Sequence, residues 1–173
     1  YVAHARELGN PVPDEPVSFI KPDTALIYDG GIIELPRQSR DVHHELEVVI
    51  RIDRLGRSIE EKYAHKYFSE IGLGVDFTAR DLQKKQKEKG LPWEIAKGFD
   101  YSAPLSEFLP VSQFKDIHNL SFRLDLNGKT VTYSTGTNKR AHGVLLNMRD
   151  TANKNVKAVN GIVIQKNPEG EYT

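Results

Sequence analysis

The stretch His43-His44-Glu45-Leu46-Glu47-Val48-Val49-Ile50 decides the fold and carries the first candidate site. Its continuation to Ile52 is β-branched and apolar, which predicts a strand with a well-buried face. Side chains two residues apart on a strand point the same way, about 6–7 Å from each other, so Glu45 and Glu47 should project together. Like charges at the edge of a core repel, and a hard cation such as Mg2+, Mn2+ or Ca2+ relieves the repulsion. The alternative is a half-exposed strand edge with two solvated glutamates.

Length and composition restrict the class of protein. The 173 residues suit one domain, expected to span 1–173, with a sizeable core. Lysine plus arginine equals aspartate plus glutamate at 24 each, so the zero net charge gives no electrostatic basis for binding nucleic acid or an anionic membrane. No apolar run reaches the length of a membrane span and no signal peptide is visible. The absence of cysteine excludes disulfides and thiolate metal sites. We therefore expect a soluble, cytoplasmic protein.

Three elements are predicted around the central strand. Val17–Pro22 and Ile32–Leu35 have the character of short strands. Ser58 with Glu61 forms a capping-box pattern ahead of an apolar stripe of Ile59, Tyr63 and Tyr67, which predicts a helix.

A second buried strand brings another carboxylate. Ile71 to Phe77 is apolar except for Asp76, and Thr78-Ala79-Arg80-Asp81 follows as an N-cap signal. The helix that it starts should run to about Lys89 and end at Gly90. A carboxylate between a strand end and a helix start is often a ligand, although Asp76 could instead cap the helix.

Three further candidates stand apart from the carboxylates. His4 and Glu7 would be neighbours on a helical turn, where a carboxylate raises the basicity of an imidazole; the alternative is a surface ion pair. Lys97 is flanked by small and apolar residues, so it could stabilise a developing negative charge or extend its ammonium to the solvent. Lys21 could face the site, although a solvated lysine is the simpler interpretation.

The last part of the chain changes character. Ser121–Lys129 alternates strictly and contains Asn127-Gly128, which predicts a β-hairpin. Beyond Tyr133 the sequence is polar, and only 161–164 still has the character of a strand. The remainder has weak periodicity and is expected to be irregular.

These motifs, in this order, resemble the fumarylacetoacetate hydrolase family, and most closely its acylpyruvase and oxaloacetate decarboxylase branch. The resemblance covers roughly residues 1–130. The matching segments are His4–Glu7, Phe19–Pro22, His43–Glu47, Asp76–Asp81 and Gly90–Trp93 followed by Lys97.

The resemblance implies a fold and a set of site residues. The fold would be α+β, a mixed β-roll with short flanking helices, in a homodimer, with a lid at about residues 1–16. The implied metal ligands for Mg2+ or Mn2+ are Glu45, Glu47 and Asp76, and the implied catalytic residues are His4 and Glu7, which activate water, and Lys97, which stabilises an oxyanion. The implied substrate-binding residues are Lys21, Arg80, Gln83 and Thr137.

Three functions follow from the resemblance. The first is metal-dependent hydrolysis of a C–C bond in an acylpyruvate, a small keto-acid substrate, which yields pyruvate and a carboxylic acid. The second is decarboxylation or keto–enol tautomerisation of oxaloacetate on the same site, which needs no attacking water. The third is an inactive metal-binding homologue. It is suggested because Thr135–Asn138 lacks the proline of the family's substrate loop and about 138–173 match the family poorly.

Overall fold

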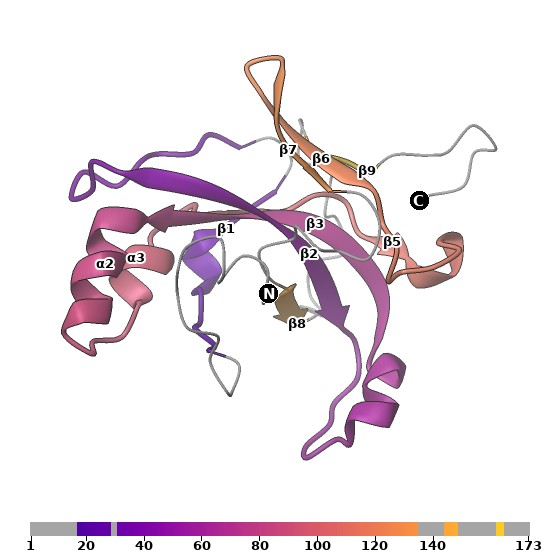
Figure 1. Cartoon of the computed structure of the whole chain (residues 1–173). Coiled ribbons are helices and arrows are strands. Elements are labelled where there is room, and N and C mark those ends of the chain that lie inside the picture. The colour runs from indigo at the N-terminus through magenta and orange to yellow at the C-terminus, as the bar shows by residue number, and fades with distance from the viewer. Residues whose placement is uncertain (1–16, 29–30, 135–143, 149–161, 165–173) are drawn as a thin grey trace.

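Two long strands form the centre of the molecule. The computed structural model describes residues 17–28, 31–134, 144–148 and 162–164. Strand β2 (Val42–Ile52) pairs antiparallel with β3 (Phe68–Ala79), and both curve through the whole fold (Figure 1). Strands β5 (Leu109–Pro110) and β8 (Val144–Met148) extend this pair into a sheet of order β5-β3-β2-β8 in the described part of the chain. Because β8 runs parallel to β2 while β3 runs antiparallel to it, the sheet is mixed.

The alternation along β2 gives the sheet two different faces. Leu46 and Val48 lie on one face with Leu73 and Val75 of β3, and Phe114, Leu120 and Phe122 complete the main core there. Glu45, Glu47 and Val49 lie on the other face, where Val49 packs with Leu105 and Phe108. The apolar residues of the sequence therefore fix which face of β2 receives the glutamates.

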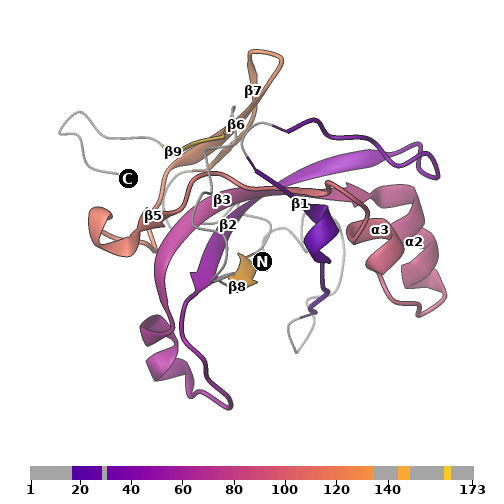
Figure 2. The same cartoon turned by 180° about the vertical axis from the view of Figure 1, so that it is seen from behind.

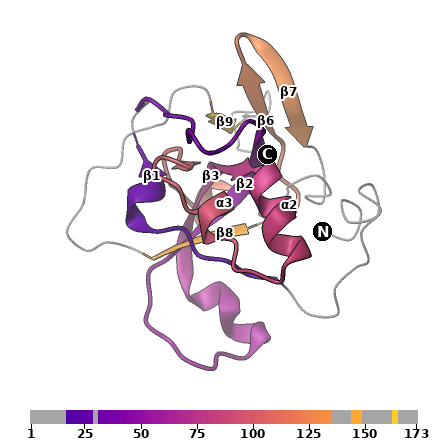
Figure 3. The same cartoon turned by 90° about the vertical axis from the view of Figure 1, so that its left-hand side faces the viewer.

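Smaller elements surround the central sheet. β6 (Phe122–Leu126) pairs with β7 (Lys129–Ser134) and β9 (Ile162–Ile164), and β1 (Leu26–Ile27) pairs with β4 (Ala103–Pro104). The hairpin of β6 and β7 rises on one side of the sheet (Figure 2). The helices α2 (Arg80–Glu88) and α3 (Glu94–Lys97) lie together at the end of the sheet where β3 ends (Figure 3). Short 3-10 helices cover Asp23–Ala25, Glu61–Lys66 and Val111–Gln113.

Several sequence predictions are confirmed. The central strand, the strand that contains Asp76, the helix that stops at Gly90 and the Asn127-Gly128 hairpin are all present. Gly90, Asn127 and Gly128 have positive φ, as a helix stop and a tight hairpin turn require. Ile162–Ile164 forms a strand within the predicted range, whereas β8 was not predicted.

Other predictions are wrong. The segments 17–22 and 32–35 form no strand. The helix predicted from Ser58 is a 3-10 helix that starts at Glu61. Its cap position is Glu60, which makes no side-chain cap hydrogen bond, and Ser58 has a φ of 53°, so it lies outside the helix. The residues of its expected apolar stripe contact the solvent in part, so no buried face holds a longer helix there. In the described ranges, no helix has the length and apolar character needed to cross a membrane.

Candidate metal centre

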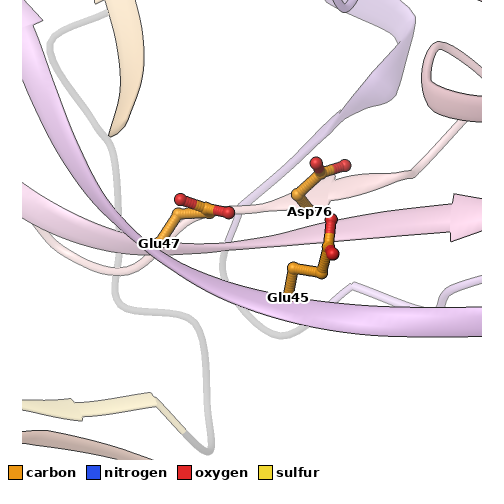
Figure 4. Close-up of side chains that lie close together, drawn as sticks. All are labelled: Glu45, Glu47 and Asp76. Carbon is orange, nitrogen blue, oxygen red and sulfur yellow. The ribbon is translucent and has the colours of Figure 1, made fainter. Parts of the chain in front are cut away.

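Three buried carboxylates converge on one side of the central strand pair. Glu45 lies directly opposite Asp76 in the ladder, and Glu47 lies opposite Gly74, which has no side chain to occupy the same face. One oxygen from each carboxylate lies within 4.8 Å of the others, and all three residues are buried. Figure 4 shows Glu45 and Glu47 projecting from β2 toward Asp76 on β3. Hard carboxylate oxygens at this spacing can hold a divalent cation such as Mg2+ or Mn2+.

The Lys97 side chain joins the carboxylates. Its Nζ donates to Glu45 Oε2 at 2.7 Å, to Asp76 Oδ2 at 2.6 Å and to Thr78 Oγ1 at 2.6 Å. The ammonium also lies 4.8 Å from the centre of the Phe19 ring. The short helix α3 brings this buried lysine to the cluster, so Lys97 does not extend to the solvent as the alternative interpretation supposed.

Lys21 approaches the cluster from the other side of Asp76. Its Nζ lies 2.8 Å from Asp76 Oδ1 in an ion pair, and its side chain is 6% exposed. Burial lowers the pKa of Lys21, and the Asp76 carboxylate opposes that effect. The interpretation of Lys21 as a solvated lysine is therefore wrong, because the ammonium lies inside the protein.

Arg80 stands at the rim of the cluster. Its Nη2 donates to Glu45 Oε1 at 2.5 Å and its Nη1 donates to Gln83 Oε1 at 2.7 Å. The Arg80 side chain is 30% exposed, so the guanidinium contacts both the buried glutamate and the solvent. It occupies the first position of α2, where the backbone N–H of Arg80 donates to Asp41 O at 2.7 Å.

Glu47 provides the test of whether the cluster suits a cation. Burial raises the pKa of Glu47 to about 9, and the charges of Asp76 and Glu45 add to this effect. Glu47 Oε2 is buried and has no hydrogen-bond donor among the described residues. Since a buried polar oxygen without a partner is costly, the residues present fit a cation that binds this oxygen.

The structure describes most of the predicted site residues. It brings together Glu45, Glu47, Asp76, Lys97, Lys21, Arg80 and Gln83. His4, Glu7 and Thr137 lie outside the described residues, so their roles stay predictions. Thr78 was interpreted only as an N-cap, but the cap position of α2 is Ala79 and no side chain caps the helix. Instead, the Thr78 hydroxyl donates to Glu45 Oε2 at 3.2 Å and accepts from Lys97.

The sequence of the chain matches a known protein family. The model of the family described as fumarylacetoacetate (FAA) hydrolase C-terminal matches residues 1–144. The chain belongs to the fumarylacetoacetate hydrolase family. This membership agrees with the mixed sheets and few helices of the structure and confirms the predicted α+β fold class.

Two curated relatives resemble the chain over three-quarters of its length. The mitochondrial oxaloacetate tautomerase FAHD1 of Arabidopsis thaliana is 42% identical over 130 residues, which are 75% of this chain and 58% of the relative. The mitochondrial oxaloacetate decarboxylase of Dictyostelium discoideum is 42% identical over 130 residues, which are 75% of this chain and 60% of the relative. The chain thus spans about six-tenths of the length of these relatives.

A solved structure of a fumarylacetoacetate hydrolase family member shares the fold. The fumarylpyruvate hydrolase of Pseudomonas aeruginosa, in complex with Mn2+ and pyruvate, has a TM-score of 0.71 and is 28% identical. The match covers 92% of this chain and 77% of that one. The curated relatives support the predicted oxaloacetate alternative better than the acylpyruvate hydrolase prediction. Both are named as mitochondrial proteins, so the expected cytoplasmic location stays a prediction.

Proposed function

We propose that this chain carries the metal centre of an enzyme that interconverts the keto and enol forms of oxaloacetate, with decarboxylation of oxaloacetate as a related activity. The observation that carries the proposal is the cluster of three buried carboxylates, whose oxygens lie within 4.8 Å of one another beside three cationic side chains. The oxaloacetate enzymes that are 42% identical support the choice of substrate.

The metal would be held by Glu45, Glu47 and Asp76. Carboxylate ligands without cysteine or histidine favour Mg2+ or Mn2+, and Ca2+ is a further hard cation. When bound, such an ion supplies Lewis-acid polarisation of the oxygens of a 2-keto acid. The Mn2+ named in the fumarylpyruvate hydrolase structure supports the same class of ion.

Arg80 is the residue that best suits the second carboxylate of oxaloacetate. Of the cationic side chains that contact the cluster, Lys97 and Lys21 are 4% and 6% exposed, whereas Arg80 is 30% exposed. An arginine can bind a carboxylate through two parallel hydrogen bonds, and Gln83 orients the Arg80 guanidinium through Nη1. Arg80 would therefore bind and orient the substrate while it keeps its contact to Glu45.

Two of the three acceptors of Lys97 Nζ, Glu45 Oε2 and Asp76 Oδ2, belong to proposed metal ligands, so a bound cation would compete for them and free donors of this ammonium. Lys97 would then suit the negative charge that develops on a substrate oxygen. Its ammonium is buried, and a fixed charge in such a site stabilises an oxyanion more strongly than it would in water. Tautomerisation breaks one C–H bond next to the keto group and forms one O–H bond, so a side chain must carry the proton. In the proposal His4 carries that proton and Glu7 orients the imidazole.

Hydrolysis of an acylpyruvate is the second candidate. The fumarylpyruvate hydrolase structure, which contains pyruvate, favours it, but that protein is 28% identical, compared with 42% for the oxaloacetate enzymes. For this reaction the same His4–Glu7 pair would remove a proton from water. The single-domain span 1–173, the lid at about 1–16 and the homodimer remain parts of the proposal.

The test follows three reactions side by side in the presence of Mg2+. Ultraviolet absorbance measures the enol–keto conversion of oxaloacetate, and separate assays measure pyruvate formation and acetylpyruvate loss. Glu47→Gln removes one proposed ligand, and Glu70→Gln changes a carboxylate of β3 that pairs with Arg51 instead. We expect enol–keto conversion that Glu47→Gln abolishes and Glu70→Gln leaves intact.

The other outcomes separate the alternatives. Loss of acetylpyruvate without oxaloacetate conversion would establish the hydrolase, and pyruvate formation from oxaloacetate alone would establish the decarboxylase. Mg2+ binding without change in either substrate would identify an inactive homologue.

A further inference from the structure

Lys21 has more acceptors than an ammonium can use. Its Nζ lies within hydrogen-bond distance of Phe77 O at 3.3 Å, Ser102 O at 3.1 Å and Ser102 Oγ at 3.0 Å. It also donates to Lys97 O and forms the 2.8 Å ion pair with Asp76 Oδ1. An ammonium has three hydrogens, so these protein groups already occupy its donors. Lys21 is therefore not free to bind a substrate carboxylate.

The partners of Lys21 come from distant parts of the chain. Asp76 and Phe77 belong to the end of β3, whereas Lys97 and Ser102 flank the turn between α3 and β4. Ser102 Oγ in turn donates to Lys97 O at 2.9 Å. The buried Lys21 ammonium thus links the strand that carries Asp76 to the backbone of Lys97, whose side chain is the second cation beside Asp76.

The two lysines hold Asp76 from both sides. Lys21 contacts Oδ1 at 2.8 Å and Lys97 contacts Oδ2 at 2.6 Å. A carboxylate held at both oxygens has little freedom to rotate. Groups that support a metal ligand in this way set its orientation, and their loss lowers metal affinity by about 10–100-fold in other sites.

We propose that Lys21 is a positioning residue of the metal centre: it orients Asp76 and fixes the backbone of Lys97, and it does not contact the substrate. This inference rests on the proposed metal centre. It replaces the substrate-binding role expected from the sequence.

The test compares Mn2+ binding with folding stability in the full chain. Lys21→Met removes the charge and the donors, and Lys21→Gln removes the charge but keeps an N–H donor for the carbonyls. Lys62→Met is the matched control, because Lys62 pairs with Glu60 at the surface and is 62% exposed. Electron paramagnetic resonance measures bound Mn2+ and its coordination, and urea unfolding measures stability.

We expect both Lys21 variants to bind Mn2+ about 10–100-fold more weakly, with an altered spectrum, while Lys62→Met matches the unsubstituted protein. A folded Lys21 variant that binds Mn2+ within about twofold of the unsubstituted protein would overturn the positioning role, even if its stability falls. If only Lys21→Gln folds, its Mn2+ affinity alone decides whether Lys21 has the positioning role. If neither variant unfolds cooperatively, Lys21 is a folding residue and the proposal is wrong.

The unsubstituted protein separates this inference from the proposed function. If that protein binds no Mn2+, the metal centre itself is refuted. If it binds Mn2+ and only the Lys21 prediction fails, the proposed function is unaffected.

Discussion

Glu45 and Asp76 face each other across the antiparallel ladder of β2 and β3, and the Lys97 ammonium lies 2.7 Å from one carboxylate and 2.6 Å from the other. The register of the two strands creates this pair. A slip of one residue would move Asp76 to the face that holds Leu73 and Val75 in the core. The apolar residues that fix the register therefore also assemble the charged cluster.

Replacement of Asp76 should destabilise the protein as well as the metal centre. Asp76→Asn removes the charge that faces both Lys21 and Lys97 in a buried site. Breaking a buried ion pair from one side typically lowers the free energy of unfolding by about 3–5 kcal/mol. Urea unfolding in the absence of metal measures this loss.

Glu70→Gln is the control for Asp76→Asn. Glu70 also lies on β3 and pairs with Arg51 at 2.8 Å, but its side chain is 28% exposed. We expect a loss of about 1 kcal/mol or less for Glu70→Gln. If Asp76→Asn and Glu70→Gln lowered the free energy of unfolding equally, the buried cluster would not stabilise the protein more than a partly exposed ion pair does.

Substitution of Arg80 should distinguish substrates by their number of carboxylates. Arg80→Gln removes the partly exposed cation while Gln83 and the metal ligands remain. A charge-assisted hydrogen bond contributes about 1.5–3 kcal/mol, so KM for oxaloacetate should rise by about 10–100-fold. The KM for acetylpyruvate, which has one carboxylate, should change less. Steady-state kinetics with both substrates measures the difference.

Arg123→Gln is the matched control for Arg80→Gln. Arg123 also pairs with a carboxylate, Asp125 at 3.0 Å, but it lies in the β6–β7 hairpin. It should leave both KM values unchanged. An equal rise in KM for both substrates in Arg80→Gln would show that Arg80 acts through Glu45 and not on the second carboxylate.

The Thr78 hydroxyl should stabilise the charged cluster. Thr78→Val keeps the shape of the side chain but removes the group that accepts from Lys97 and donates to Glu45. A hydrogen bond to a charged group contributes about 1.5–3 kcal/mol, and we expect a loss of that size in the free energy of unfolding. Thr78→Ser keeps the hydroxyl and should recover most of the loss. Similar unfolding curves for Thr78→Val and the unsubstituted protein would refute this role.

Local patterns in the sequence were enough to predict the elements that form the carboxylate cluster. Alternation along β2 places Glu45 and Glu47 on one face. The helix start at Arg80 was also readable, although the strand before it runs past Asp76 to Ala79 and does not end at the carboxylate. The hairpin at Asn127-Gly128 was equally readable, because two residues with positive φ leave few alternatives. Each of these features is set by residues that lie close together in the sequence.

The environment of the lysines depends on distant residues and could not be read in the same way. The backbone carbonyls that accept from Lys21 lie 56 to 81 residues away in the sequence, so no local pattern distinguishes it from a solvated lysine. Thr78 is similar, because a threonine before a helix usually indicates a cap, and only the fold shows Lys97 beside it. The strands predicted at 17–22 and 32–35 failed because no strand pairs with them in the described part of the chain.

The affinity for Mg2+ should increase with pH because of Glu47. Burial, together with Asp76 and Glu45, raises the pKa of Glu47 to about 9, so below that pH the metal-free protein holds a proton on this carboxyl. A cation that binds Glu47 must displace the proton, and the apparent affinity should rise by up to about tenfold per pH unit below that pKa. Isothermal titration calorimetry in several buffers measures both the affinity and the released proton.

The stability of the metal-free protein should decrease as the pH rises, whereas the affinity for Mg2+ increases. A carboxyl with a raised pKa in the folded state contributes stability that is full below its ordinary pKa of 4.5 and is lost as the pH rises toward about 9. Without metal, the thermal midpoint should therefore fall over this range, and added Mg2+ should reverse the fall. In Glu47→Gln, which cannot titrate, both pH dependences should be weaker. A Mg2+ affinity of the unsubstituted protein that is constant with pH would show that Glu47 is already ionised without metal.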